Sequence, residues 1–336
     1  MYNEERKLQF IQETETASGN DAWISAVFNL VEVSERKLGR DIAEFTASEV
    51  GEALATPGVI TAVTINNRIL LIVRYKKWCA EHGFESVQVL SSEIMVDISD
   101  NIRGTMVAGP AHLASLLAES FPDVHKKSAK VIYRAYLWFA FSGMEKEEAV
   151  ALRVSDVNIR QRKAHTNRDR WYTIHELGIR DVARACELKE FERNVRFGVG
   201  TFPRTDGDLI LRGRRLNKDI PPEKYIRETL RPTVQSGFKS AGHPGLSYDR
   251  IRKSGIFYEA FSREAIAEIP PNFYTLAHDD FELGHPEPVS PGAKHKSIQR
   301  INVMYNRDYS AWKRAFEPEL REEFGFEKIP DLMNRM

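Results

Sequence analysis

Apolar residues recur at helical spacing along the first hundred positions of the chain. From Asp21 onward, Val27 and Val31 are among the residues that fall on one face of a helix. Thr46 and Glu49 then have the spacing of a capping box, in which each residue satisfies a backbone N–H of the other at a helix start. The pattern therefore predicts a small helical bundle.

A long helix is expected from residue 61 to residue 83, because apolar residues line one side of it and Gly83 stands where a C-cap favours positive φ. Residues 1–20 are polar and predict a flexible tail. Residues 84–110 contain glycine, proline and several short polar residues, and they predict an interdomain linker with one short element.

The stretch Ala135–Ile159 combines three expected elements. An apolar helix ends at the small residues Ser142 and Gly143, a second amphipathic helix follows, and a strand opens at Val154. Beyond it, β-rich runs at 157–159 and 171–174 flank a polar, basic turn and predict a hairpin. The fold class is thus mainly α with a small β-hairpin or sheet (α+β).

Length, composition and charge narrow the function classes. With 336 residues, 42% of them hydrophobic, the chain can form two or three domains. Its formal net charge is zero, from 48 basic and 48 acidic residues, but residues 160–170 carry five basic side chains against one acidic. Such a block is either a surface that neutralises phosphates or a solvated basic face.

Several classes find no support in the sequence. No apolar run approaches the roughly 20 residues of a spanning helix, and no signal or transit pattern opens the chain, so we expect a cytoplasmic protein. Cys79 and Cys186 lie far apart and predict buried free thiols in a reducing compartment. No nucleotide-binding loop or hydrolase elbow occurs, and His278 has no ligand partner at usable spacing, so no cofactor and no metal are expected.

Four segments occur in an order that resembles the tyrosine recombinase (phage integrase) family. Residues 142–157, SGMEKEEAVALRVSDV, are similar to the first signature of its catalytic domain, and RIRKSG at 250–255 is similar to the second. LGH at 283–285 matches a third box, and tyrosines near the C-terminus offer a nucleophile. The resemblance implies a SAM-like helical core-binding domain at 21–103, a linker at 104–110 and a catalytic-type domain at 111–336.

The resemblance assigns roles to individual residues and exposes two departures. Arg252 corresponds to the second phosphate-binding arginine, and His285 to a hydrogen-bond donor to the phosphate. Tyr305 or Tyr309 would be the nucleophile, with Tyr305 favoured. Glu145 stands where the family's T-G-L-R turn has its arginine, and Asp249 stands where a histidine is usual.

The predicted hairpin would deliver a lysine to the leaving oxygen in that family. Lys163 is the one lysine available there, although a solvated basic hairpin explains it equally well. The further residues expected to bind DNA are Arg162, Arg168, Arg170, Arg212, Arg214, Arg215, Arg250 and Lys253.

The two departures bear on catalysis, because transesterification at a phosphodiester adds negative charge that guanidinium groups stabilise. A carboxylate about 4 Å from a phosphate oxygen repels it by roughly 1 kcal/mol even at the dielectric constant of water. Losing one electrostatic donor costs on the order of a hundredfold to a thousandfold in rate. Glu145 and Asp249 therefore predict weak or absent catalysis.

The expected function is that of a DNA-binding, recombinase-like protein of a mobile element, acting in DNA recombination or integration. Its expected partners are double-stranded DNA in the nucleoid and further copies of itself on DNA. Two alternatives stay open at this point. One is an active site-specific integrase that cleaves DNA through a tyrosine, and the other is a helical protein-interaction module that does not bind DNA.

Overall fold

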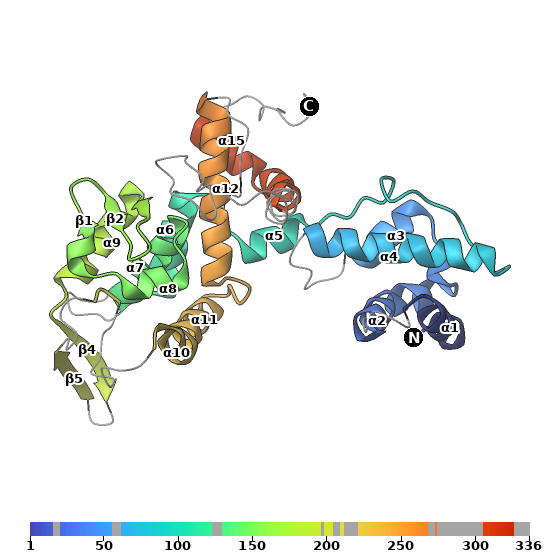
Figure 1. The fold of residues 1–336 in the computed structure, drawn as a ribbon, viewed down its shortest axis with the longest axis horizontal. Coiled ribbons are helices and arrows are strands. Elements are labelled where there is room, and N and C mark those ends of the chain that lie inside the picture. The colour runs from blue at the N-terminus through green and yellow to red at the C-terminus, as the bar shows by residue number, and fades with distance from the viewer. Residues whose placement is uncertain are drawn as a thin grey trace. The chain divides into compact units, whose positions relative to one another are not determined.

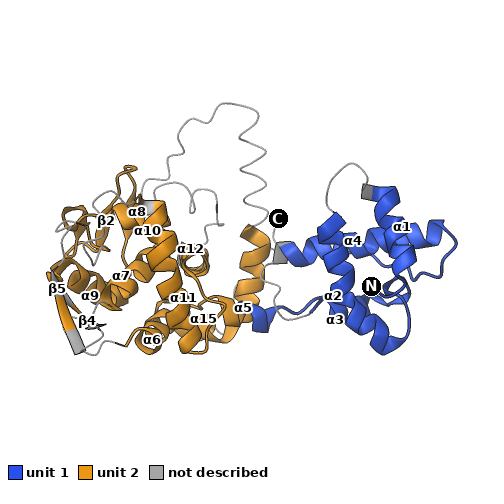
Figure 2. Ribbon diagram, turned by 90° about the horizontal axis from the view of Figure 1, so that it is seen from below, with its two compact units in different colours: residues 1–102 blue, residues 103–336 orange. Residues whose placement is uncertain are grey.

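The computed structural model describes residues 1–15, 21–55, 62–122, 130–195, 198–203, 209–211, 221–267, 273 and 305–325. The chain divides into two compact units, Met1–Ile102 and Arg103–Met336, each with a hydrophobic core of its own (Figure 2). Each unit is described by itself below.

Unit 1 is helical throughout its described elements (Figure 1). They are α1 (Glu4–Glu15), α2 (Asp21–Leu38), the 3-10 helix η1 (Ile42–Glu44), α3 (Ala47–Leu54), α4 (Ala62–Glu81) and the start of α5 (Ser99–Thr105). The local signals in the sequence place two of the helix ends correctly. Thr46 and Glu49 form the predicted capping box at the start of α3, and Gly83 has φ of 76° just after α4.

The N-terminal segment differs from the prediction of a flexible tail at 1–20. Residues 4–15 form helix α1, and Phe10 is fully buried with its ring 5.2 Å from that of Tyr75 and 6.0 Å from that of Phe28. Lys7, one turn before Phe10, is also fully buried. The prediction is wrong for α1 because three inward-facing residues among many polar ones are enough to anchor a helix. Residues 16–20 lie outside the described part.

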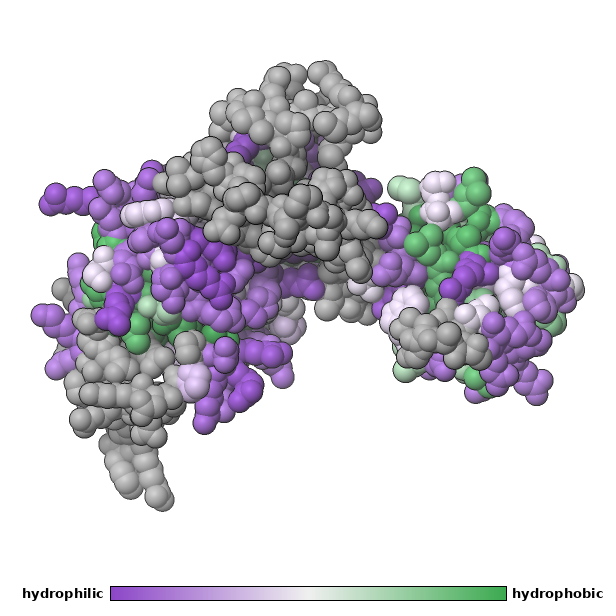
Figure 3. All heavy atoms as spheres, in the orientation of Figure 1, coloured by the Kyte–Doolittle hydropathy of each residue, from purple (hydrophilic) through white to green (hydrophobic). Residues whose placement is uncertain are grey.

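Hydrophobic side chains also reach the surface of unit 1. Figure 3 shows hydrophobic atoms gathered on the visible face of this unit. Its exposed large hydrophobic residues are Leu8, Trp23, Val33, Leu38, Leu70, Val87, Leu90 and Met95.

Unit 2 combines helices with two small antiparallel sheets, which confirms the predicted mainly α, α+β class. Its first elements are α6 (Pro110–Ser120), α7 (Lys130–Phe141), α8 (Lys146–Ala151), η2 (Val154–Asp156), β1 (Val157–Asn158), β2 (Lys163–His165), β3 (Trp171–Thr173) and α9 (Glu176–Glu187). Then follow β4 (Glu190–Val195), β5 (Gly198–Pro203), α10 (Pro222–Tyr225), the π-helix η3 (Ile226–Leu230), α11 (Arg231–Ser240), α12 (Tyr248–Ala267) and α15 (Glu317–Phe324). Residues 305–315 are also helical.

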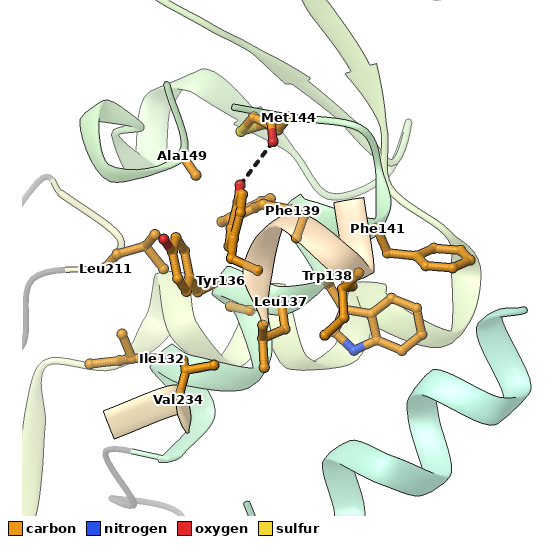
Figure 4. Packing of buried hydrophobic residues seen from close by; sticks show 14 of the residues in the cluster. Ile132, Tyr136, Leu137, Trp138, Phe139, Phe141, Met144, Ala149, Leu211 and Val234 are labelled. Atoms are coloured by element: carbon orange, nitrogen blue, oxygen red, sulfur yellow. Dashed lines mark hydrogen bonds between the residues drawn. The ribbon is translucent and has the colours of Figure 1, made fainter. Parts of the chain in front are cut away.

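Helix α7 is the centre of this unit, with nine of its residues buried. Figure 4 shows its side chains Tyr136, Trp138, Phe139 and Phe141 pointing to different neighbours. Helix α12 comes so close that a Cβ on Gly255 would lie 1.7 Å from the Phe141 carbonyl oxygen. The glycine is therefore required for α12 to reach the turn that follows α7.

The two runs predicted to form a hairpin, 157–159 and 171–174, do not pair with each other: they contain the edge strands β1 and β3 of a three-stranded sheet with β2 between them. Strand β2 pairs with β1 through Ala164 and Val157, and with β3 through Ala164 and Tyr172. The basic block therefore contains a strand in its middle and two turns. The sequence missed it because β2 has only three residues and one buried side chain, Ala164.

The segment 104–110, expected to be a linker, packs into unit 2 where it is described. The backbone N–H of Val107 donates to Ser254 Oγ at 3.1 Å, and its carbonyl accepts from the Trp312 indole at 2.9 Å. The division between the two units falls before this segment, at residues 102 and 103.

Candidate nucleic-acid interface

The turn between α7 and α8 sets the position of Glu145. Gly143 has φ of 88°, a conformation that glycine adopts without strain, and it ends α7 two residues before Glu145. The Glu145 backbone N–H donates to Glu148 Oε2 at 3.3 Å, and its carbonyl accepts from Ala149 N at 2.9 Å. The backbone of Glu145 is thus fixed at the start of α8, while its side chain extends toward the β2–β3 loop.

Three arginines surround the Glu145 carboxylate. Arg168 Nη1 donates to Oε2 at 2.5 Å, and Arg170 Nη1 and Arg252 Nη2 each lie 3.9 Å from Oε1. Arg168 and Arg170 come from the β2–β3 loop, whereas Arg252 comes from α12. We call Glu145, Arg168, Arg170 and Arg252 the arginine cluster.

The electrostatics of the cluster favour an anion. Burial alone would raise the pKa of Glu145, but the hydrogen bond from Arg168 and the charges of Arg170 and Arg252 lower it below its usual value. The same hydrogen bond raises the pKa of Arg168. Glu145 is therefore ionised at neutral pH, and the arginine cluster holds three guanidiniums against this one carboxylate.

Arg252 is held against the turn that carries Glu145. Its Nε donates to the Gly143 carbonyl at 2.7 Å, which leaves the Nη groups on the side of the Glu145 carboxylate. The Tyr248 hydroxyl, one turn earlier on α12, donates to the Met144 carbonyl at 3.0 Å. Two hydrogen bonds thus join the start of α12 to two consecutive residues of the first signature, Gly143 and Met144.

Glu148, which the sequence did not suggest as a site residue, fixes the β2–β3 loop. Its buried carboxylate accepts hydrogen bonds from Thr166 Oγ1 and the Tyr172 hydroxyl, both at 2.9 Å, and lies 3.5 Å from Arg170 Nε. The three-residue spacing of Glu145 and Glu148, that of a capping box, was the only local signal for it.

The two candidate tyrosines differ in their surroundings although they lie one helical turn apart. Tyr305 is half-buried and stands beside Arg252; burial raises its pKa, and the charge of Arg252 and a hydrogen bond with it offset part of the rise. Tyr309 is fully buried and donates to Glu264 Oε2 at 2.5 Å. The structure therefore brings Tyr305, the favoured candidate, to the arginine cluster and keeps Tyr309 in the core.

The remaining candidates on α12 make other contacts. Asp249 is exposed and forms an ion pair of 2.8 Å with Lys146. Lys253 forms an ion pair with Asp308, and its Nζ lies 5.0 Å from the centre of the Tyr305 ring. Arg250 is half-buried, and burial lowers its pKa although Asp308 and Asp249 oppose the shift. None of these three is in the arginine cluster.

The candidates at the other end of the small sheet lie away from the β2–β3 loop. Lys163 opens β2 and pairs in register with Asn158 and Thr173, whereas the loop begins after the last residue of β2. Arg162 has φ of 58°, and its guanidinium lies 3.5 Å from Glu176. Four further candidates, His285, Arg212, Arg214 and Arg215, lie outside the described residues.

Two other kinds of site have no counterpart in the described part of the chain. No helix among the described residues is long and apolar enough to cross a membrane. In the same part of the chain, no three His, Cys, Asp or Glu side chains gather as metal ligands would.

Comparison with known proteins shows a similarity for the first part of the chain. The family model "MrpR, N-terminal core-binding domain" matches residues 1–81. Residues 1–81 are therefore similar to a core-binding domain, as the sequence resemblance implied, and the matched segment includes α1. A search of curated proteins gave no match.

Solved structures that align with most of the chain are recombinases and integrases of low similarity. XerA recombinase is 13% identical over 95% of this chain and 98% of its own, with a TM-score of 0.39. The Tn1549 transposon integrase, in complex with circular intermediate DNA, is 13% identical over 87% and 98%, with a TM-score of 0.33. The integrase of mycobacterium phage Brujita is 14% identical over 93% and 91%, with a TM-score of 0.31.

Proposed function

We propose that the chain is a DNA-binding, recombinase-like protein of a mobile element that holds duplex DNA without cleaving it. The observation that carries this proposal is the arginine cluster. Guanidinium groups from the β2–β3 loop and from α12 converge on one point, and planar guanidiniums suit phosphate oxygens well. The core-binding domain at residues 1–81 supports the same reading.

The absence of cleavage follows from the place of Glu145. Its carboxylate lies among the guanidiniums that would stabilise the extra negative charge of a transition state, and it would repel that charge. Asp249, in the position where a histidine was expected, pairs with Lys146 and donates no proton there. Assembly of several copies on DNA, and a place in the nucleoid, belong to the same proposal.

Paired arginine and lysine variants test DNA binding. Arg252→Ala should weaken binding to a DNA duplex about tenfold, because it removes a charge-assisted phosphate contact. Lys37→Ala, an exposed substitution on α2 in the acidic N-terminal region, should leave the affinity nearly unchanged. Fluorescence anisotropy with a labelled duplex, repeated over a range of salt concentrations, measures both.

The same titration separates the alternatives. Equal affinities of the two variants would contradict a DNA contact by Arg252. If the wild-type chain fails to bind any duplex even at low salt, the hydrophobic surface of unit 1 would instead favour a protein-interaction module.

A further inference from the structure

Glu145 occupies the position that an external anion would take in the arginine cluster. We propose that its carboxylate is an internal substitute for a DNA phosphate, which the side chain must give up when the DNA backbone binds. Glu145 would then act as an autoinhibitory group that weakens non-specific binding. This inference rests on the proposed function and adds a regulatory step to it.

The distances show that the carboxylate is too small for its surroundings. Arg168 hydrogen-bonds to it, while the Arg170 and Arg252 nitrogens that face it stand 3.9 Å away, beyond hydrogen-bond range. A phosphodiester is wider and carries two non-bridging oxygens and two bridging ones. It would reach more than one of these guanidiniums at once.

The charges around Glu145 also allow another anion to replace its carboxylate. Glu148 lies 3.5 Å from Arg170 Nε and partly neutralises that arginine, and Glu145 balances one more positive charge. Three guanidiniums thus face two carboxylates. A phosphate that replaces the Glu145 carboxylate keeps the charge balance unchanged, so the exchange is electrostatically feasible.

Access and mobility favour the exchange. The side chains of Glu145 and Arg168 are 25% and 44% exposed, so both can be reached from solvent. The Glu145 backbone is tied to α8 through Glu148 and Ala149, so its side chain can turn outward without unfolding the helix. Arg252 stays in place during this movement because its Nε is bound to the Gly143 carbonyl.

A pair of matched charge variants tests the inference. Glu145→Gln should bind duplex DNA about fivefold to tenfold more tightly than wild type, because the competing carboxylate is gone. Glu176→Gln removes the same charge from a glutamate that pairs with Arg162 in the same unit, and it should change the affinity less than twofold. Equal effects of the two variants would overturn the inference.

A second pair keeps the test valid if Glu145→Gln does not fold. Arg168 and Arg162 have closely matched exposure, 44% and 46%, and each pairs with one of the two glutamates. Arg168→Gln should weaken DNA binding more than Arg162→Gln. The reverse order would contradict the proposed site.

Amide hydrogen exchange of the peptide that covers residues 161–173 distinguishes the replacement of Glu145 by a DNA phosphate from a purely structural role of Glu145. In Glu145→Gln without DNA, the β2–β3 loop should exchange faster than in wild type, and DNA should restore its protection. Faster exchange together with unchanged or weaker DNA binding would overturn the inference. If the wild-type chain binds DNA and Arg252→Ala weakens this binding, the proposed function stands even when Glu145→Gln does not raise the affinity. If the wild-type chain does not bind DNA, the proposed function and the inference about Glu145 are both wrong.

Discussion

Two glutamate ion pairs, one in each unit, show opposite uses of a carboxylate. In unit 1, Lys7 Nζ donates to both oxygens of Glu35 at 2.6 Å, and both side chains are fully buried. In unit 2, the partly exposed Glu145 faces three arginines and accepts a hydrogen bond from Arg168. The Lys7–Glu35 pair is fully buried and both carboxylate oxygens are hydrogen-bonded. Glu145 is partly exposed, and the positive charge around it exceeds its own negative charge.

The pKa directions of the two glutamates follow from this difference. Burial raises the pKa of Glu35, and the charge and hydrogen bonds of Lys7 offset only part of the rise. At Glu145 burial acts in the same direction, but Arg168, Arg170 and Arg252 together outweigh it and lower the pKa. Keeping Glu35 charged therefore costs free energy, whereas the arginines around Glu145 favour its charged form.

The largest expected effect on stability comes from removing one partner of the buried Lys7–Glu35 ion pair. Lys7→Met should lower the free energy of unfolding of the chain by about 3–5 kcal/mol, because it leaves Glu35 as an unpaired buried charge. The double variant Lys7→Met with Glu35→Met should recover much of this loss, since neither charge remains. Urea unfolding followed by circular dichroism measures the stability of both variants. If Lys7→Met is as stable as wild type, the contrast between the Lys7–Glu35 pair and the arginine cluster is lost.

A smaller effect on stability is expected from removing the charge of Glu145 in the arginine cluster. Glu145→Gln should lower the free energy of unfolding by about 1 kcal/mol at pH 7, as is usual for a partly exposed ion pair. Because the pKa of Glu145 is lowered in the folded chain, its contribution is present above the ordinary value of 4.5 and is lost as the pH falls through the lower folded value.

Unfolding of wild type and Glu145→Gln at several pH values between 3 and 7 checks this dependence. The difference between the two proteins should shrink as the pH falls. A difference that grows on acidification would mean that the folded pKa of Glu145 is raised, as that of Glu35 is.

The smallest expected signal concerns strand cleavage. With a suicide DNA substrate, the wild-type chain should form no detectable tyrosine-linked adduct, because Glu145 brings a negative charge, in place of a guanidinium, next to the reacting phosphate. An adduct that Tyr305→Phe abolishes and Tyr309→Phe retains would instead establish an active integrase. Tyr309→Phe is the matched control because its hydroxyl is buried against Glu264.

The local features of the fold could be predicted from the sequence. The capping box of Thr46 and Glu49, the glycine at the end of α4 and the break at Gly143 all depend on residues within one turn of each other. The core-binding domain was foreseen from its order and its helix pattern, although α1 was missed because most of its residues are polar.

What the sequence by itself determined, then, is the local element order around Glu145 and the conflict between its charge and a phosphate site. Only the tertiary structure decided where that charge lies. Arg168 is 23 residues away in sequence and the Arg252 contact to Gly143 spans 109 residues, so no local pattern specifies them. The buried packing of α7 against α9 and α12, and the glycine at 255, bring these groups together. Long-range packing thus places the glutamate that departs from the signature among three arginines.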